Sequence, residues 1–321
     1  MKKIVKIIII NLFLFNFSTN LLSTEKSANF ILDKDEEKVA IISWNLQVQN
    51  AKSSMGEVSS EDLINEANEA IKKYEEILRA KPDCIYVQIE MASAYLVKKE
   101  FDKSEQIIRK ILPQLKSSSY NKLLLFRDLT LFNLGLALEY QDKYTDACKV
   151  YENAYKDFLK VLKKNPNNIR LKEIVAKYEK LIWQVSVKMH IKDAEKFAEK
   201  KNYEQAIALY GKAQKIKEKK PDFIKDVELY SDGSDLYKKM GDIYREWSKE
   251  RKAIEMYEKQ VSENNDIWSY IKLLEIYFEN KNYKKSEEII MSIFRIEPEN
   301  KIAKRYLEEI KQAKKVSGIK E

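Results

Sequence analysis

Residues 234–300 contain two copies of one sequence unit, laid end to end with a period of 33 residues. Six core positions match between the copies: Met240 with Leu273, Gly241 with Leu274, Tyr244 with Tyr277, Ala253 with Ser286, Tyr257 with Ile290, and Gln260 with Ile293. This order of large, small and aromatic residues at this period is typical of stacked pairs of antiparallel helices. We therefore predict two helix pairs in series, with Pro298 closing the second.

The composition favours helices along the rest of the chain. Only six Gly and five Pro occur among 321 residues, while charged residues make up 34% and hydrophobic residues 44%. The net charge of +8 is spread among acidic neighbours and forms no dense basic block. A nucleic-acid-binding face needs Lys and Arg clustered on one side. We therefore expect an all-α protein and no nucleic-acid partner.

The first residues, Met1 to Ser23, have the pattern of an export signal. Lys2, Lys3 and Lys6 precede an apolar run from Ile7 to Phe17, which ends in a polar stretch. Such a segment is a secretory signal peptide, or, over residues 4–22, a retained membrane tether. No Cys follows the apolar run, so a lipoprotein signal is excluded in this sequence. Both alternatives place the protein outside the cytoplasm, in the periplasm or anchored facing outward.

Upstream of the regular pair, apolar residues recur at helical spacing in less regular units. We predict a first helix from Glu36 to Lys52, a helix capped by Ser60, and two helices over 85–118 that turn near Lys99. A third unit covers 128–161, and a single long helix covers 169–198. The last part of that helix begins a fourth unit, 187–220.

These positions resemble the tetratricopeptide repeat (TPR) family. The residues that carry the resemblance are Leu134-Gly135, Met240-Gly241-x-x-Tyr244, Ala253-x-x-x-Tyr257, Ala206-x-x-x-Tyr210, Ala70-x-x-x-Tyr74, Pro82 and Pro298. In this family Gly and Ala lie where two helix axes approach most closely, and the aromatic residues fill the gaps beside them. The resemblance implies a right-handed α-solenoid of TPR-like helix pairs with a C-terminal capping helix, and a role as a protein-interaction scaffold.

The expected organisation follows from these patterns. The segments are 1–23, a signal peptide or membrane anchor; 24–35, a flexible segment; 36–84, N-terminal helices with the first TPR-like unit; 85–220, an irregular TPR array with a long helix; 234–300, two regular TPRs; and 301–321, a capping helix and tail.

Residues with catalytic chemistry are scarce. His190 is the only histidine, and no Ser or Cys nucleophile has a recognisable His partner motif. Cys84 and Cys148 lack metal-binding spacing, and the six glycines form no phosphate-binding loop. We therefore expect no enzyme activity, no cofactor and no metal. A hydrolase built from carboxylates across a groove is the least favoured alternative, because no stretch is left for a catalytic domain.

In TPR proteins the first helix of each pair lines a concave groove. Carried over to this chain, the resemblance implies a partner-binding groove of Tyr86, Ile89, Leu96, Phe132, Leu136, Tyr140, Arg245, Trp268 and Phe278. An apolar concave surface usually marks a contact site. We hypothesise that an amphipathic helix or hydrophobic peptide lies against its first half. The alternative is that the helix over 36–52, or the long helix, folds over this surface.

The function that these features favour is a non-catalytic adaptor in the cell envelope that holds another protein, itself an envelope or membrane protein. A membrane-tethered protein that self-associates through its apolar terminal faces is the second candidate. The oligomeric state and the identity of the partner stay open at this stage.

Overall fold

The computed structural model describes residues 34–54, 56–115, 122–219 and 235–317. The predicted signal segment and the other residues up to 33, together with 55, 116–121, 220–234 and 318–321, lie outside this part of the chain. Within the described residues the secondary structure is helical, with short turns between the helices and no strand. They divide into two compact units, Met1–Ser186 and Val187–Glu321.

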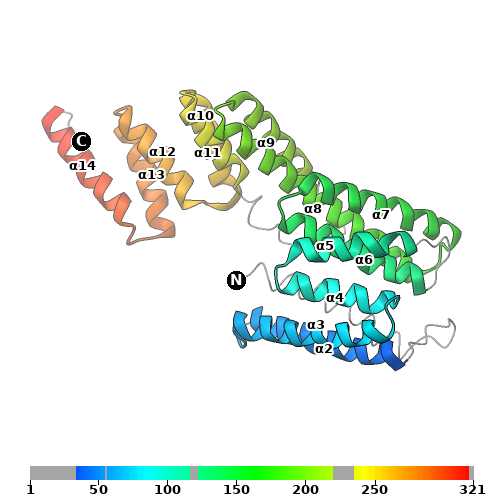
Figure 1. Cartoon of the computed structure of the whole chain (residues 1–321). Coiled ribbons are helices and arrows are strands. Elements are labelled where there is room, and N and C mark those ends of the chain that lie inside the picture. The colour runs from blue at the N-terminus through cyan, green and yellow to red at the C-terminus, as the bar shows by residue number, and fades with distance from the viewer. Residues whose placement is uncertain (1–33, 55, 116–121, 220–234, 318–321) are drawn as a thin grey trace. The chain divides into compact units, whose positions relative to one another are not determined.

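Unit 1 is a series of antiparallel helices, each packed on the next (Figure 1). Its elements are α2 (Lys34–Ser54), α3 (Ser60–Ala80), α4 (Ile85–Val97), α5 (Phe101–Ile111), the 3₁₀ turn η1 (Leu112–Leu115), α6 (Lys122–Tyr140), α7 (Tyr144–Lys164) and the first part of α8 (Ile169–Glu199). The helices match the predicted ones, including the long helix. One correction concerns the cap of α3. Ser59, not Ser60, accepts the backbone N–H of Asp62, at 3.0 Å.

Unit 2 begins within α8 and continues the same architecture. It contains α9 (Tyr203–Glu218), α10 (Leu236–Glu246), α11 (Glu250–Asn264), α12 (Ile267–Glu279), α13 (Tyr283–Ile296) and α14 (Lys301–Ser317). The predicted helix pairs over 234–300 are α10 with α11 and α12 with α13, and α14 packs against α12 and α13 as the expected capping helix. The described residues thus form an all-α helical repeat of TPR-like pairs. The right-handed course of the array stays a prediction.

The same turn joins the two helices of five pairs. One residue in each turn has a positive φ of 55° to 63°; these are Lys99, Asp142, Lys201, Ser248 and Lys281. The next backbone N–H then reaches back to a carbonyl in the last turn of the helix, as from Lys143 to Leu138 at 2.9 Å. This is the hydrogen-bond pattern that closes a helix around a left-handed residue. The recurring turn identifies the two helices of a repeat even where the sequence spacing is irregular.

Within a pair, a small residue on the first helix faces a large one on the second. A Cβ atom built on Gly135 would lie 2.0 Å from the Tyr151 ring, and one on Gly241 would lie 2.6 Å from the Tyr257 ring. Both tyrosines are fully buried. In other pairs the residues sixteen positions apart are also buried: Ala92 and Ile108, Ala194 and Tyr210, and Leu274 and Ile290. At Gly135 and Gly241 the absence of a side chain is what lets the two helices approach so closely.

Gly135→Ala is expected to destabilise the fold, because the added methyl group would occupy space that the buried Tyr151 ring fills. Overpacking of this kind costs about 1–3 kcal/mol of unfolding free energy. Gly211→Ala is the matched control, since Gly211 lies in α9 with no atom within 4 Å of a built Cβ. That change should stabilise the protein by about 0.5–1 kcal/mol through helix propensity. Urea unfolding monitored by circular dichroism measures both; equal effects of the two substitutions would contradict the proposed close approach.

Candidate partner-binding site

The structure places three residues of the predicted groove in the core of unit 1. Tyr86, Ile89 and Phe132 are 7%, 0% and 1% exposed. Leu96 and Leu136 are half-buried, and only Tyr140 remains well exposed, stacked on Phe101 at a centroid distance of 4.9 Å. The prediction of an open apolar groove over Tyr86, Ile89 and Phe132 is therefore corrected: these side chains hold helices together and are not accessible to a partner.

Helix α2 covers the first part of this surface, as the alternative interpretation of the sequence proposed. Tyr86 belongs to the same buried cluster as Val39 and Leu46 of α2. Its other face stacks on Phe126 of α6, with ring centroids 5.2 Å apart. Because α2 already occupies this face, no further amphipathic helix can lie there without displacing it.

The long helix α8 covers the second part, around Phe132. The Lys177 ammonium group lies 5.3 Å from the centroid of the Phe132 ring and forms an ion pair with the buried carboxylate of Asp128. The neighbouring Tyr178 hydroxyl donates a hydrogen bond of 2.9 Å to the Asp128 carbonyl. A buried charge pair with good hydrogen bonds is costly to break, because removing one partner leaves the other uncompensated. This contact fixes α8 over α6.

A buried carboxyl group lies between α2 and α4. Glu90 is 5% exposed, and the Ser43 hydroxyl of α2 donates a hydrogen bond of 2.6 Å to it. Burial raises the pKa of Glu90 to about 7, although the hydrogen bonds from Ser43 and Tyr86 oppose the shift. The ordinary pKa of such a group is 4.5. The folded state therefore keeps the proton over a pH range in which the unfolded chain has lost it.

Glu90→Gln should remove a pH-dependent loss of stability. Below pH 4.5 the Glu90 carboxyl is protonated in both states, and as the pH rises to about 7 only the unfolded state releases the proton, so the wild type loses stability and then levels off. Gln does not ionise and keeps an acceptor for Ser43. Between pH 4.5 and 8 the variant should gain about 3 kcal/mol relative to the wild type.

Chemical unfolding at several pH values measures this difference. Glu76→Gln, on the exposed side of α3, is the control for the loss of one carboxyl group. An equal relative gain in the two variants would show that the buried position of Glu90 has no special role.

In unit 2, the predicted residues Arg245 and Trp268 lie on one accessible surface. Trp268 is 59% exposed at the start of α12. Arg245 of α10 donates to Glu275 at 2.7 Å and to Glu279 at 2.9 Å, both on α12. Trp268 and Glu275 are seven residues apart, which places them on the same face of a helix. We call Arg245, Trp268, Lys272, Glu275 and Glu279 the α10/α12 surface; Lys272 also pairs with Glu275, at 3.1 Å.

Phe278 is not part of this surface. Its ring packs against Tyr306 of the capping helix α14 in an edge contact, with centroids 5.0 Å apart, and lies 6.0 Å from the Tyr283 ring. The capping helix α14 therefore covers part of Phe278, whose side chain is half-buried. That Phe278 faces a partner stays a prediction.

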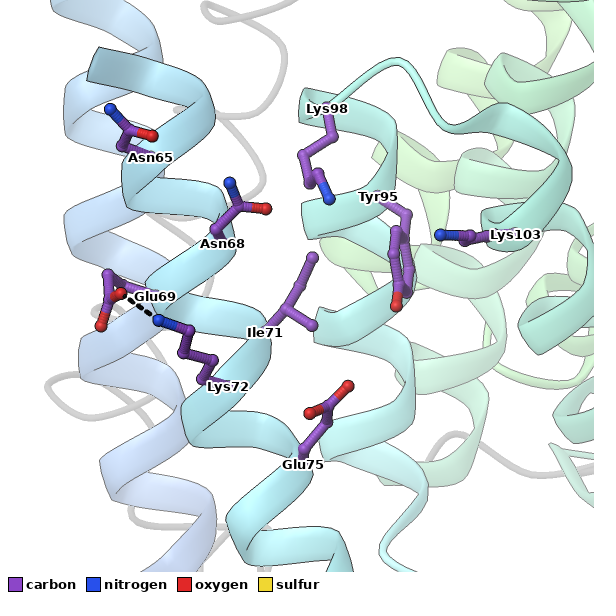
Figure 2. Close-up of a pocket in the computed structure, with 9 residues that line it drawn as sticks. All are labelled: Asn65, Asn68, Glu69, Ile71, Lys72, Glu75, Tyr95, Lys98 and Lys103. Carbon is purple, nitrogen blue, oxygen red and sulfur yellow. Dashed lines mark hydrogen bonds and ion pairs between the residues drawn. The ribbon is translucent and has the colours of Figure 1, made fainter. Parts of the chain in front are cut away.

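A polar pocket of about 490 Å³ lies between α3 and the α4–α5 turn of unit 1. Figure 2 shows Asn65, Asn68 and Lys72 along α3, opposite Lys98, Tyr95 and Lys103. Sequence analysis missed it, because none of these residues is at a groove position of the repeat pattern. The available signal was the polar series Asn65, Asn68, Lys72 and Glu75, which follows one face of α3 at helical spacing. That series becomes the wall of a pocket only because α4 and α5 lie beside it.

Catalytic and metal chemistry finds no support in the described residues. They contain no group of three or more His, Cys, Asp or Glu side chains placed to hold a metal ion. Cys84 and Cys148 are both free, and burial raises the pKa of the Cys148 thiol. His190 is half-buried, and burial lowers its pKa. In the described ranges no helix combines the length and apolar character needed to span a bilayer.

Comparison with known proteins gives similarity at the level of structure alone. No protein-family model matches the chain, and no curated protein sequence matches it. Among solved structures, it is similar to the C-terminal part of a TPR repeat-containing protein from Cytophaga hutchinsonii, at 16% identity over 77% of this chain and 98% of that one, with a TM-score of 0.40. It is also similar to BtubC from P. vanneervenii, at 15% identity over 74% and 91% of the two chains, with a TM-score of 0.37.

A third similar structure is that of PilF from Pseudomonas aeruginosa, at 13% identity over 86% of this chain and 100% of that one, with a TM-score of 0.32. At these identities and TM-scores the similarity bears on no function. The assignment of a TPR-like helical repeat rests on the recurring turn and the small-to-large packing within the pairs of this chain.

Proposed function

We propose that this protein is a non-catalytic scaffold that binds another protein, and that the α10/α12 surface is a docking site. The exposed Trp268 carries the proposal. Trp268 stays 59% exposed, although it lies on a helix that buries apolar residues such as Leu273 and Leu274. Aromatic residues of this kind dominate binding energy at protein interfaces, where they fill a pocket on the partner.

The charges beside Trp268 favour a partner with an apolar pocket next to a basic group. Glu275 is neutralised by Arg245 and Lys272, whereas the Glu279 side chain is 60% exposed and shares Arg245. Because Arg245 and Glu275 are held by hydrogen bonds, they lose little freedom when a partner binds. The surface therefore combines an aromatic anchor with pre-oriented charges, which favours specific rather than general adhesion.

Trp268→Ala should abolish or strongly weaken capture of the partner while leaving the helical content unchanged. Loss of a central aromatic anchor typically costs about 2 kcal/mol or more of binding free energy, which is a reduction in affinity of about thirtyfold. Met291→Ala is the matched control, because Met291 is also apolar and 61% exposed, but lies on α13 outside the α10/α12 surface. Tagged full-length wild type, Trp268→Ala and Met291→Ala are each used for affinity capture from the native cell. The amount of captured partner is then compared among the three proteins.

Equal loss of captured protein in the Met291 and Trp268 variants would contradict a specific site at Trp268. If instead the captured protein is a second copy of this chain, the self-association alternative replaces the adaptor. Sedimentation at increasing protein concentration separates these two outcomes.

Export across a membrane is the second part of the proposal, and the envelope is where we place the partner. The support is the basic start and apolar run of residues 1–23. Residues 1–35 fused to alkaline phosphatase should give an active reporter in a bacterial host, because this enzyme needs disulfides that form outside the cytoplasm. Deletion of residues 7–17 should abolish the activity. An active reporter with the deletion, or an inactive one with the intact segment, would overturn the export proposal.

A further inference from the structure

Helix α2, the first described helix of unit 1, is held there through a contact that is half polar. It packs on α3 and α4 (Figure 1). Four of its described side chains are buried, at intervals of three and four residues: Glu36, Val39, Ser43 and Leu46. A helix is normally held on a core by an apolar stripe. Because two of these four side chains are polar, the docking of α2 depends on how well their polar groups are satisfied.

A chain of hydrogen bonds runs along this contact from α2 to α4. The Gln47 amide donates to the Ser43 hydroxyl at 3.3 Å, and that hydroxyl donates to the Glu90 carboxyl group at 2.6 Å. The side-chain carbonyl oxygen of Gln47 is buried and has no hydrogen-bond partner among the described residues. A buried acceptor without a partner weakens the contact, because water would satisfy it if α2 moved away.

Within the described residues no positive charge compensates the Glu90 carboxyl group. The Tyr86 hydroxyl of α4 donates a hydrogen bond to it, and Tyr74 of α3 interacts with its charge. Burial first, and Glu90 second, raise the pKa of both tyrosines, so both stay neutral. Glu36 of α2 interacts with the same Tyr86, and no described ionisable group of α5 or α6 acts on Glu90. An ionised Glu90 is therefore a buried charge held by hydroxyl groups alone, which is costly.

We propose that α2 is a pH-controlled cover of unit 1, which stays docked while Glu90 is protonated and is released when Glu90 ionises. Release lets water reach the Glu90 carboxylate and the Gln47 carbonyl oxygen. It also uncovers Tyr86 and the apolar side chains that share its cluster with α2. The contact of Gly135 with Tyr151 belongs to another part of unit 1, so the pairing of α6 with α7 does not depend on α2. The device is independent of the α10/α12 surface of unit 2.

The direction of the pH effect follows from the two states of α2. Burial holds the pKa of Glu90 at about 7 when α2 is docked, against an ordinary value of 4.5 when water reaches the group. Below pH 4.5 both states are protonated, and docking is strongest. Between pH 4.5 and 7 only the released state loses its proton, so docking weakens by up to about tenfold per pH unit. Above pH 7 both states are ionised, and the effect levels off.

Amide hydrogen exchange of the full chain at pH 5, 6, 7 and 8 tests the proposal. Protection factors are compared, because they remove the pH dependence of the intrinsic exchange rate. Peptides from α2 should lose protection by up to about tenfold per pH unit from pH 5 to 7, and little more at pH 8. At every pH they should be less protected than peptides from α7, because α2 opens without unfolding of the whole unit.

Variants on both sides of the contact assign the effect to Glu90. Glu90→Gln should make the protection of α2 independent of pH and raise it about 100-fold over the wild type at pH 8. Glu76→Gln, on the exposed side of α3, should behave as the wild type. Ser43→Ala removes a hydrogen bond to the ionised group and should lower the protection of α2 at pH 8 by about tenfold.

Three results would each overturn the proposal. The first is equal protection of α2 and α7 at every pH, since α2 would then open only with the whole unit. The second is protection of α2 that does not change between pH 5 and 7. The third is an unchanged pH dependence in the Glu90→Gln variant, or, if that variant does not fold, wild-type protection of α2 at pH 8 in Ser43→Ala.

Discussion

The structure depends on how closely the two helices of each pair approach. At Gly135 and Gly241 there is no room for even a methyl group, because the ring of a buried tyrosine from the second helix fills that space. Ala92 and Leu274 precede the smaller Ile108 and Ile290 by sixteen residues, whereas Ala194 precedes a buried tyrosine, Tyr210. The recurring turn with one left-handed residue then reverses the chain direction in five of the pairs.

This packing decides which surfaces remain for binding. In unit 1, α2 and α8 complete the burial of the apolar side chains on α4 and α6, and leave a polar pocket on another face. In unit 2, the capping helix α14 covers part of Phe278 but not Trp268, which remains exposed beside the Arg245 ion pairs. The two surfaces therefore differ in chemistry. The α10/α12 surface combines an aromatic anchor with paired charges, and the pocket is lined by amides and by lysines that pair with glutamates.

The periodicity of the sequence predicts the helices and their pairing well, because small and aromatic residues at fixed spacing have a direct packing reason. The long helix over 169–198 follows from the absence of Gly and Pro between Asn168 and Lys200. The site is less predictable. Whether Tyr86 and Phe132 are open depends on residues more than 40 positions away, such as Ser43 and Lys177, and no local pattern encodes which helix covers them. The polar pocket likewise exists only when Asn68 and Lys98 are brought together.

Amide hydrogen exchange of the full chain, followed by mass spectrometry, tests the central claim that buried small-to-large contacts hold the helix pairs together. The slowest exchange in each unit is expected in the segments that carry these contacts, around Gly135 and Tyr151 in unit 1 and around Gly241 and Tyr257 in unit 2, because their opening requires loss of the whole pair. Exchange there as fast as at the exposed end of α14 would contradict the account.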